Sequence, residues 1–281
     1  MKKITTGLIL LVVLVTLWTV QGPILRIALS CFGFAAVGEM AAAMHGAGIR
    51  MARWPSMLFA ALAMPVYVLF GWSAELSLFV ILVLVSLSAF VLRGDVDLEA
   101  MAATIFPMVY PGLMFTMIFP LQDLASPLLA TMALGLSFVS ALLTDVFAWA
   151  IGMRFGRHKL APAISPKKTI EGAVGGLVGA AVSTPACVGV SMLIVRLTVS
   201  AEAMAYPRPN MAILILVSVL AGAASQLGDL TASAVKRRCG IKDYANFLPG
   251  HGGMMDRIDS VLFSIVIWHV FFLFFMQAVV L

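Results

Sequence analysis

Apolar stretches long enough to cross a membrane follow one another along nearly the whole chain, and they decide what it can fold into. A helix needs about 20 apolar residues to cross about 30 Å of hydrocarbon. By this measure the sequence predicts nine spanning helices, at approximately 5–21, 24–44, 56–72, 76–93, 101–120, 127–152, 171–197, 211–235 and 258–281.

Composition supports this prediction. Hydrophobic residues make up 62% of the chain and charged residues 11%, whereas a soluble domain carries about 25% charged residues. The fold class we expect is therefore an all-α, polytopic integral membrane protein. The net charge of +5 comes from loops between spans and does not indicate a nucleic-acid partner. Cys31, Cys187 and Cys239 form no CxxC pair, so neither a disulfide framework nor a zinc site is predicted.

The count of nine depends on a few ambiguous segments. Glu39 and His45 interrupt the second segment, and Pro107 and Pro111 kink the fifth, so eight or ten helices remain open. The first apolar run follows Met1-Lys2-Lys3 as in a signal peptide. No small-residue cleavage site follows it, and we interpret it as a retained first helix.

The basic residues favour one orientation. If the N-terminus is cytoplasmic, fifteen of the 18 Lys and Arg residues fall in cytoplasmic segments, as the positive-inside rule requires. Only Arg26, Arg196 and Arg208 fall on the other side. Both large polar loops, 153–170 and 236–257, would then face the cytoplasm.

The most polar stretch of the chain lies between residues 225 and 260. Asp229 precedes Ser233, Lys236 and Arg237 on one helical face. A loop rich in glycine and proline follows, and then Asp256, Arg257 and Asp259 begin the last apolar run. Acids at two helix ends, a cationic patch and a glycine loop suit a metal–polyphosphate complex. The alternative is a salt-bridge network that joins two helices.

A second polar region surrounds the loop 153–170. Asp145 lies inside an apolar run, where an unpaired carboxylate is unfavourable, so we expect a partner or a cation beside it. It would be a ligand or an orienting group, or else a helix-end carboxylate paired with a basic residue of the loop. In the loop, Lys167, Lys168 and Thr169 come just before a helix is expected to restart. Such a helix start suits phosphate, and the alternative is a basic loop held by anionic headgroups.

These two regions carry a resemblance to a known family. The run Ser233-x-Val235-Lys236-Arg237-x4-Lys242-Asp243-x-Ala245-x2-Leu248-Pro249-x-His251-Gly252-Gly253-Met254-x-Asp256-Arg257-Ile258-Asp259 resembles the signature of the phosphatidate cytidylyltransferases, the CDP-diacylglycerol synthases. The segment 155–172 is similar to that family's FGxHKLxPxISPxKTxEG segment, and a glycine-rich helix follows it. The resemblance implies a membrane enzyme whose partners are CTP and phosphatidic acid, and which yields CDP-diacylglycerol and pyrophosphate.

With this resemblance, each polar residue receives an expected role. We expect Asp229 and Asp256 to bind Mg²⁺, with room for a second cation. The expected catalytic residues are Lys236, Arg237, Arg257, Ser233 and Asp259. The expected substrate-binding residues are Lys167, Lys168, Thr169, Lys242, His251, Gly252, Gly253 and Asp145.

The chain divides into an N-terminal transmembrane region, 1–125, and a catalytic transmembrane core, 126–281. The location we expect is the inner membrane of a bacterium, with the site facing the cytoplasm. The sequence leaves four questions open: whether the protein is a homodimer, which acyl chains it prefers, whether it uses CTP or dCTP, and whether the acceptor is a related lipid phosphate. A secondary transporter of an anionic solute is the main alternative. A CDP-alcohol phosphotransferase ranks third, because its aspartate-rich motif is missing from the sequence.

Overall fold

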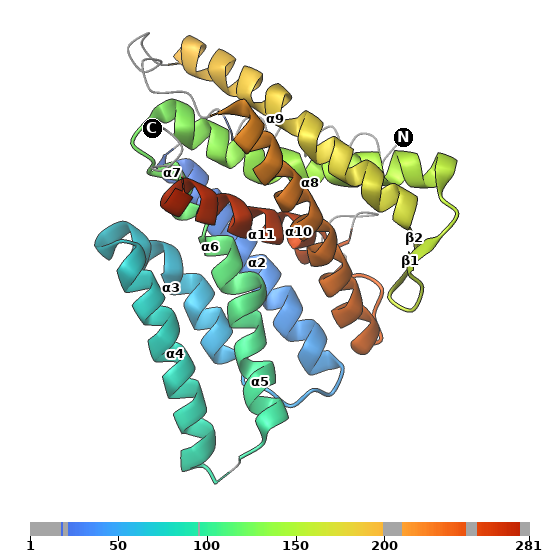
Figure 1. Ribbon diagram of the computed structural model, residues 1–281. Helices are drawn as coiled ribbons and strands as arrows, with labels where there is room; N and C mark the ends of the chain where they lie inside the picture. The colour runs from blue at the N-terminus through green and yellow to red at the C-terminus, as the bar shows by residue number, and fades with distance from the viewer. Residues whose placement is uncertain (1–17, 19–21, 95, 199–209, 246–251, 276–281) are drawn as a thin grey trace. The chain divides into compact units, whose positions relative to one another are not determined.

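The computed structural model describes residues 18, 22–94, 96–198, 210–245 and 252–275 (Figure 1). Nearly all of this part of the chain is helical. In chain order the elements are α2 (Pro23–Gly46), α3 (Trp54–Phe70), α4 (Trp72–Leu92), α5 (Leu98–Pro107), the π-helical turn η1 (Met108–Leu113), α6 (Met114–Thr116), α7 (Phe119–Gln122), α8 (Pro127–Phe155), β1 (Lys159–Ala161), β2 (Ser165–Thr169), α9 (Ile170–Thr198), α10 (Met211–Arg238), α11 (Met255–Val270) and the π-helical turn η3 (Phe271–Phe275).

The helices confirm the predicted fold class of an all-α, polytopic membrane protein. Seven helices within the described ranges are long and apolar enough to cross a membrane, and α3 is a shorter apolar helix. These eight elements correspond to the second to ninth predicted spans. The first predicted span, 5–21, lies almost wholly outside the described residues, so nine remains an approximate count.

The predicted kink in the fifth span is confirmed. The helix that runs from Leu98 to Gln122 is interrupted by η1 and contains Pro107 and Pro111. Tyr110 lies between them with φ −125° and ψ 107°, outside the helical range. Proline has no backbone N–H, and its ring crowds the preceding turn, so two prolines in close succession interrupt the helical hydrogen bonds.

One element was not predicted. β1 and β2 form a two-stranded antiparallel hairpin in which Lys159 pairs with Thr169. The chain reverses where the Ile164 backbone N–H donates to the Ala161 carbonyl at 3.2 Å. The strands are three and five residues long, too short for an alternating pattern to stand out in the sequence. The hairpin connects α8 to α9 (Figure 1).

The chain divides into two compact units, which we describe separately. Unit 1 contains 22–119 and 235–258, and unit 2 contains Trp18, 120–234 and 259–281 within their described parts. The polar stretch 235–258, which we predicted as part of the catalytic core, thus shares a unit with α2 to α6. The predicted boundary near residue 125 concerns function and stays a prediction.

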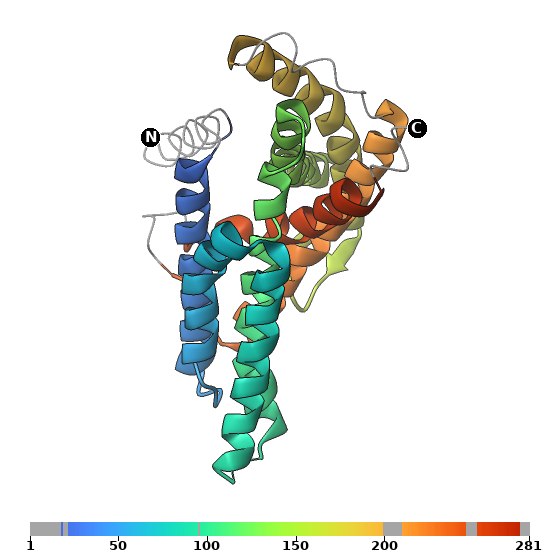
Figure 2. The same cartoon turned by 90° about the vertical axis from the view of Figure 1, so that its left-hand side faces the viewer.

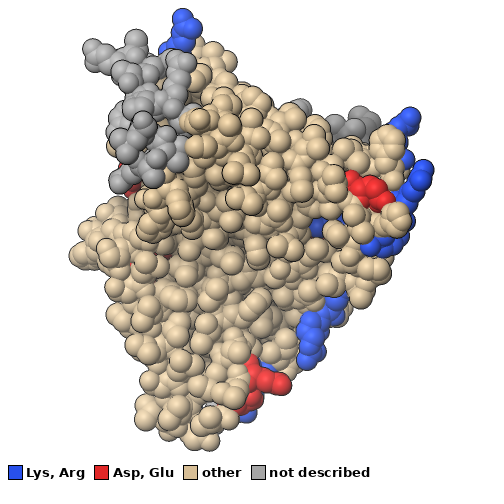
Figure 3. All heavy atoms as spheres, viewed as in Figure 1, with Lys and Arg blue, Asp and Glu red and all other residues tan. Residues whose placement is uncertain are grey.

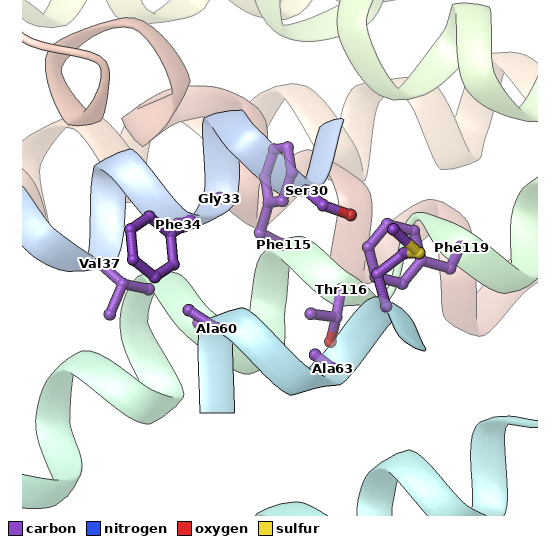
Figure 4. A pocket seen from close by; sticks show the side chains of 11 residues that line it. Ser30, Gly33, Phe34, Val37, Ala60, Ala63, Phe115, Thr116 and Phe119 are labelled. Atoms are coloured by element: carbon purple, nitrogen blue, oxygen red, sulfur yellow. The ribbon is translucent and has the colours of Figure 1, made fainter. Parts of the chain in front are cut away.

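Unit 1 is built from apolar helices that lie alongside one another. α3 packs against both α2 and α4 (Figure 2). Phe59 and Met108 are fully buried in its core. A small pocket lies among α2, α3 and α6, with mostly apolar side chains such as Phe34, Val37 and Phe115 around it (Figure 4). None of the residues predicted for the site lines this pocket, so it is not a candidate for binding a nucleotide.

Unit 2 is centred on α8 and α9, which pack closely along their lengths. Trp268 of α11 is fully buried in its core, and its indole N–H donates to the Ser140 hydroxyl at 3.3 Å. Glycines on α9 permit the close approach of α8: a Cβ at Gly179 would collide with the Leu143 carbonyl, and one at Gly172 would lie 2.7 Å from the Ala148 carbonyl. These glycines therefore allow the two helices to pack closely.

Candidate active site

The first group of polar residues lies in unit 2, around Asp229 of α10. The Lys168 ammonium is 2.5 Å from one Asp229 oxygen, and the Ser233 hydroxyl donates to the other at 3.3 Å. Both members of the ion pair keep about a quarter of their side-chain surface exposed, 25% for Lys168 and 26% for Asp229. The structure therefore brings together a predicted metal ligand, a predicted phosphate-binding lysine and the predicted serine.

Asp145 of α8 belongs to the same group. One of its oxygens accepts a hydrogen bond from the Ser260 hydroxyl at 3.0 Å. Asp229 and Lys168 are close enough to act on it electrostatically. Asp145 and Arg154, both described, form no ion pair, and the loop base that acts on Asp145 is Lys168. The Asp145 and Asp229 carboxylates thus lie near the same lysine, and each accepts a hydrogen bond from one serine hydroxyl.

Lys168 is held in place by the corner where β2 meets α9. The Thr169 hydroxyl accepts the Gly172 N–H at 3.1 Å and so caps the start of α9. Glu171 reaches back across the hairpin and accepts the Arg157 N–H at 3.0 Å, while the His158 ring nitrogen Nδ1 lies 2.6 Å away. The helix restart predicted near Thr169 is confirmed. The hairpin is tied to the helix on both sides of Lys168.

The second group lies in unit 1, around Asp256 in the first turn of α11. Its Oδ1 accepts from the Lys236 ammonium at 2.7 Å. Its Oδ2 accepts the backbone N–H groups of Tyr244 at 2.8 Å and Gly253 at 3.0 Å. The Asp256 side chain is only 8% exposed and that of Lys236 12%. This carboxylate is therefore more deeply held than Asp229.

Gly252 and Gly253 fit tightly between carboxylates. Gly252 has φ +75°, and a Cβ there would lie 2.9 Å from the Asp256 carboxylate. A Cβ on Gly253 would collide with the carboxylate of Glu39 in α2. Only glycine fits both positions without displacing an acid.

Four of the other predicted residues are exposed, namely Lys167, Lys242, Arg237 and Arg257. Arg237 donates to the Ile241 carbonyl at 3.4 Å. Asp259 is 7% exposed and accepts the Ser260 N–H at 2.8 Å. His251 lies outside the described residues.

A group of exposed bases lies at one end of the α8–α9 pair. Figure 3 shows a face that is mostly uncharged, and one of its groups of Lys and Arg side chains lies over the hairpin of β1 and β2. Arg154, Arg157, Lys159 and Lys167 are exposed there. This end of unit 2 is suited to attract phosphate groups.

The donor atoms suit a hard divalent cation. Among the described residues no three His, Cys, Asp or Glu side chains form a cluster that could hold a metal alone. Mg²⁺ does not need such a cage, because it prefers one or two carboxylates together with waters and substrate phosphates. Asp145 and Asp229, with the Ser233 and Ser260 hydroxyls, offer oxygen ligands only, and the ammonium of Lys168 lies against Asp229. The residues therefore fit Mg²⁺. Asp229 and Asp256 belong to different units, so a shared metal site stays a prediction.

Three contributors were not predicted from the sequence. Ser260 follows Asp259 directly in the motif, but nothing local assigns it to Asp145, 115 residues away. Glu171 was noted only as part of the similar segment. Glu39 stood out as an acid inside an apolar run, without a partner in view. The structure gives it one: its two oxygens accept the Met254 and Met255 N–H groups at 2.9 and 2.8 Å.

The fold and the two groups of polar residues define a class: an integral membrane protein that holds an acid–lysine pair and an exposed basic hairpin in one unit, and an acid–lysine pair beside two glycines in the other. A family profile described as the cytidylyltransferase family matches residues 1–275. The chain belongs to this family.

Similar proteins carry a more specific name. A phosphatidate cytidylyltransferase of Staphylococcus haemolyticus is 39% identical over 127 residues, which are 45% of this chain and 44% of that protein. The protein of that name in Staphylococcus aureus strain COL is 42% identical over 130 residues, with the same two shares. Phosphatidate cytidylyltransferase 5, chloroplastic, of Arabidopsis thaliana is 30% identical over 222 residues, 72% of this chain and 52% of that protein. The chain spans about half the length of the curated relatives it matches.

Proposed function

We propose that this protein transfers the cytidylyl group of CTP to phosphatidic acid and so makes CDP-diacylglycerol and pyrophosphate. The observation that carries the proposal is the pairing of Asp229 with Lys168 beside Asp145. It unites the two sequence regions that resemble phosphatidate cytidylyltransferases. The names of the similar proteins support the same activity.

The reaction needs charge neutralisation more than a base. The second pKa of a phosphomonoester lies at about 6, so phosphatidate is mostly dianionic at neutral pH. One of its oxygens attacks the α-phosphorus of CTP, the new P–O bond forms, and the bond to the β-phosphate oxygen breaks to release pyrophosphate. No proton has to be removed from the attacking oxygen. The difficulty is to bring two polyanions together.

The lysines and arginines of the two polar regions would supply the positive charge that allows the two polyanions to approach each other. Lys168 and Lys236 are held by acids at 2.5 and 2.7 Å, and the phosphates would draw on their charge. Exposed Arg237 and Arg257 would stabilise the negative charge that develops on pyrophosphate. Ser233 would donate to a phosphate oxygen.

Magnesium is part of the proposal. Asp229, with Asp145 beside it, would hold the ion, and Asp256 is the other ligand that the sequence predicts. When bound, Mg²⁺ would neutralise phosphate charge and orient the reacting groups. A second cation stays a hypothesis.

The membrane arrangement follows from charge. The chain is an integral membrane protein, and we infer that the loops 153–170 and 236–257 face the cytoplasm, where CTP is available. Fifteen of the 18 Lys and Arg residues support this orientation by the positive-inside rule. A bacterial plasma membrane fits the staphylococcal relatives. The homodimer is a further hypothesis, which cross-linking in membranes tests.

A direct assay tests the function. Purified protein in detergent or vesicles is incubated with radiolabelled CTP, Mg²⁺ and phosphatidic acid, and lipid-extractable cytidine is measured. We expect CDP-diacylglycerol with an equal amount of pyrophosphate. A preparation that binds CTP or phosphatidate but forms no lipid-linked cytidine would contradict the proposal. Substrate accumulation in sealed vesicles would then favour a transporter.

A further inference from the structure

The helix that carries Asp256 begins without an acceptor of its own. α11 starts at Met255, and the residue before it, Met254, has no side-chain oxygen. The first N–H groups of any helix lack intrahelical partners. A Ser, Thr, Asp or Asn just before the helix usually accepts one of them. The start of α11 needs an acceptor from elsewhere in the chain.

Glu39 of α2 supplies that acceptor. Its Oε1 accepts the Met254 N–H at 2.9 Å, and its Oε2 accepts the Met255 N–H at 2.8 Å. A negative charge is also favourable at a helix N-terminus, where the helix dipole is positive. Gly253 leaves room for this approach, because a Cβ there would collide with the Glu39 carboxylate.

The same short segment holds Asp256. The Asp256 carboxylate accepts the Gly253 N–H at 3.0 Å, immediately before the two N–H groups that Glu39 binds. Three consecutive N–H groups, from Gly253 to Met255, are thus bound by two carboxylates that come from opposite ends of the chain. Glu39 fixes the backbone from which Asp256 and Arg257 project.

We propose that Glu39 is a positioning residue for the nucleotidyl-transfer site: it holds the first turn of α11 so that Asp256 and Arg257 keep the direction that CTP and its cation require. The proposal rests on the proposed function for the roles of Asp256 and Arg257. Glu39 acts through the backbone and does not touch the substrate. A residue of the second helix therefore sets the geometry of a motif more than 200 positions later.

Three variants and one control test this role in the full-length protein. Glu39→Ala removes both acceptors, and we expect kcat/KM for CTP to fall about 10-fold to 100-fold, as for other partners that orient a ligand carboxylate. Glu39→Gln keeps one carbonyl oxygen and should fall between Glu39→Ala and the unchanged protein. Glu39→Asp keeps the carboxylate but withdraws it by one methylene, and it should also fall between Glu39→Ala and the unchanged protein. Glu99→Gln alters an exposed acid of α5 and should change nothing.

Two readouts separate positioning from mere stability. A positioning role raises KM for CTP and the Mg²⁺ concentration for half activation. A folding role lowers only the amount of active enzyme and leaves both constants unchanged, which would overturn the proposal. A Glu39→Asp protein less active than Glu39→Ala would also overturn it, because a partly retained acceptor for α11 should not be worse than none.

Hydrogen exchange gives a readout that needs no turnover. Mass spectrometry of a peptide covering 252–258 should show faster exchange in Glu39→Ala and partial protection in Glu39→Gln. Unchanged exchange would overturn the proposal. If the unaltered protein makes no CDP-diacylglycerol, the proposed function fails. In that case, the exchange result still shows whether Glu39 holds the start of α11. Direct titration of CTP binding then shows whether this contact affects ligand binding.

Discussion

Asp229 and Asp256 are predicted to serve one cation, yet the structure holds them in different ways. Within the described residues, the partners of Asp229 are the side chains of Lys168 and Ser233, and Asp229 stays 26% exposed. Asp256 is 8% exposed and accepts two backbone N–H groups in addition to Lys236. Side-chain partners rotate away at little cost, whereas backbone donors are fixed by the fold.

This difference in partners predicts different roles for Asp229 and Asp256. Asp229 can exchange its ammonium partner for another cation without rearranging the chain. Asp256 organises the loop between α10 and α11, because Tyr244 and Gly253 both donate to the same oxygen. We therefore expect Asp229 to matter to chemistry alone and Asp256 to chemistry and to local structure.

The largest effect is expected from removing either acid. Asp229→Asn and Asp256→Asn should each lower turnover by at least about 100-fold, the range typical of losing one group that stabilises developing charge. Both proteins should still insert into the membrane. Thermal unfolding should distinguish them: Asp256→Asn lowers the midpoint, and Asp229→Asn leaves it nearly unchanged. Near-full activity of either variant at limiting Mg²⁺ would exclude that residue as a ligand.

Replacing the lysines sharpens the comparison. Lys236→Met leaves a nearly buried carboxylate without its cation and should destabilise unit 1 by about 3 kcal/mol. Lys168→Met removes the partner of a more exposed acid and should cost about 1 kcal/mol or less. Denaturant unfolding in mild detergent measures both, and turnover should fall in both. Equal stability losses would contradict the distinction between the two acids. An active Lys236→Met enzyme would favour the alternative in which this pair only joins two helices.

Glycine substitutions test how tightly Asp256 is held. Gly252→Ala places a side chain at φ +75° and 2.9 Å from the Asp256 carboxylate, and the left-handed conformation alone costs about 1–2 kcal/mol. We expect a clear drop in both unfolding midpoint and turnover. Gly189→Ala in α9 is the matched control, because a Cβ there meets nothing within 4 Å. A Gly252→Ala protein as active as this control would show that the loop is not held as described.

Much of the fold could be predicted from the sequence, because each membrane-spanning helix requires a long apolar run that is visible in the sequence. α8 was expected to begin at residue 127 and does so, since a long apolar run has one stable conformation in lipid. The interruption at Pro107 and Pro111 was predicted for a similar reason, because proline acts locally. The short hairpin of β1 and β2 was missed, because its strands are short and because the Glu171 carboxylate, 13 residues later, binds the His158 N–H just before β1.

The partners of the acids could not be predicted in the same way. Lys168 and Asp229 are 61 positions apart and Ser260 and Asp145 are 115 apart, so their contacts depend on how whole helices pack. Glu39 gave only a partial signal, as an acid inside the second apolar run. Its contact with the start of α11 was not predicted, because the last span was expected to begin at residue 258, whereas α11 begins at Met255.

The smallest effect is expected at Ser233. Its hydroxyl donates to Asp229 at 3.3 Å, a long hydrogen bond, and contributes about 1 kcal/mol at most. Ser233→Ala should lower kcat/KM by less than about 10-fold and leave the unfolding midpoint unchanged. If Ser233 also binds a phosphate oxygen, KM for CTP carries the loss, whereas a role confined to orienting Asp229 raises the Mg²⁺ requirement instead. Titrating CTP at saturating Mg²⁺, and Mg²⁺ at saturating CTP, separates these outcomes. A loss as large as that of Asp229→Asn would show that Asp229 depends on its side-chain partners as strictly as Asp256 depends on the backbone, and the contrast between the two acids would disappear.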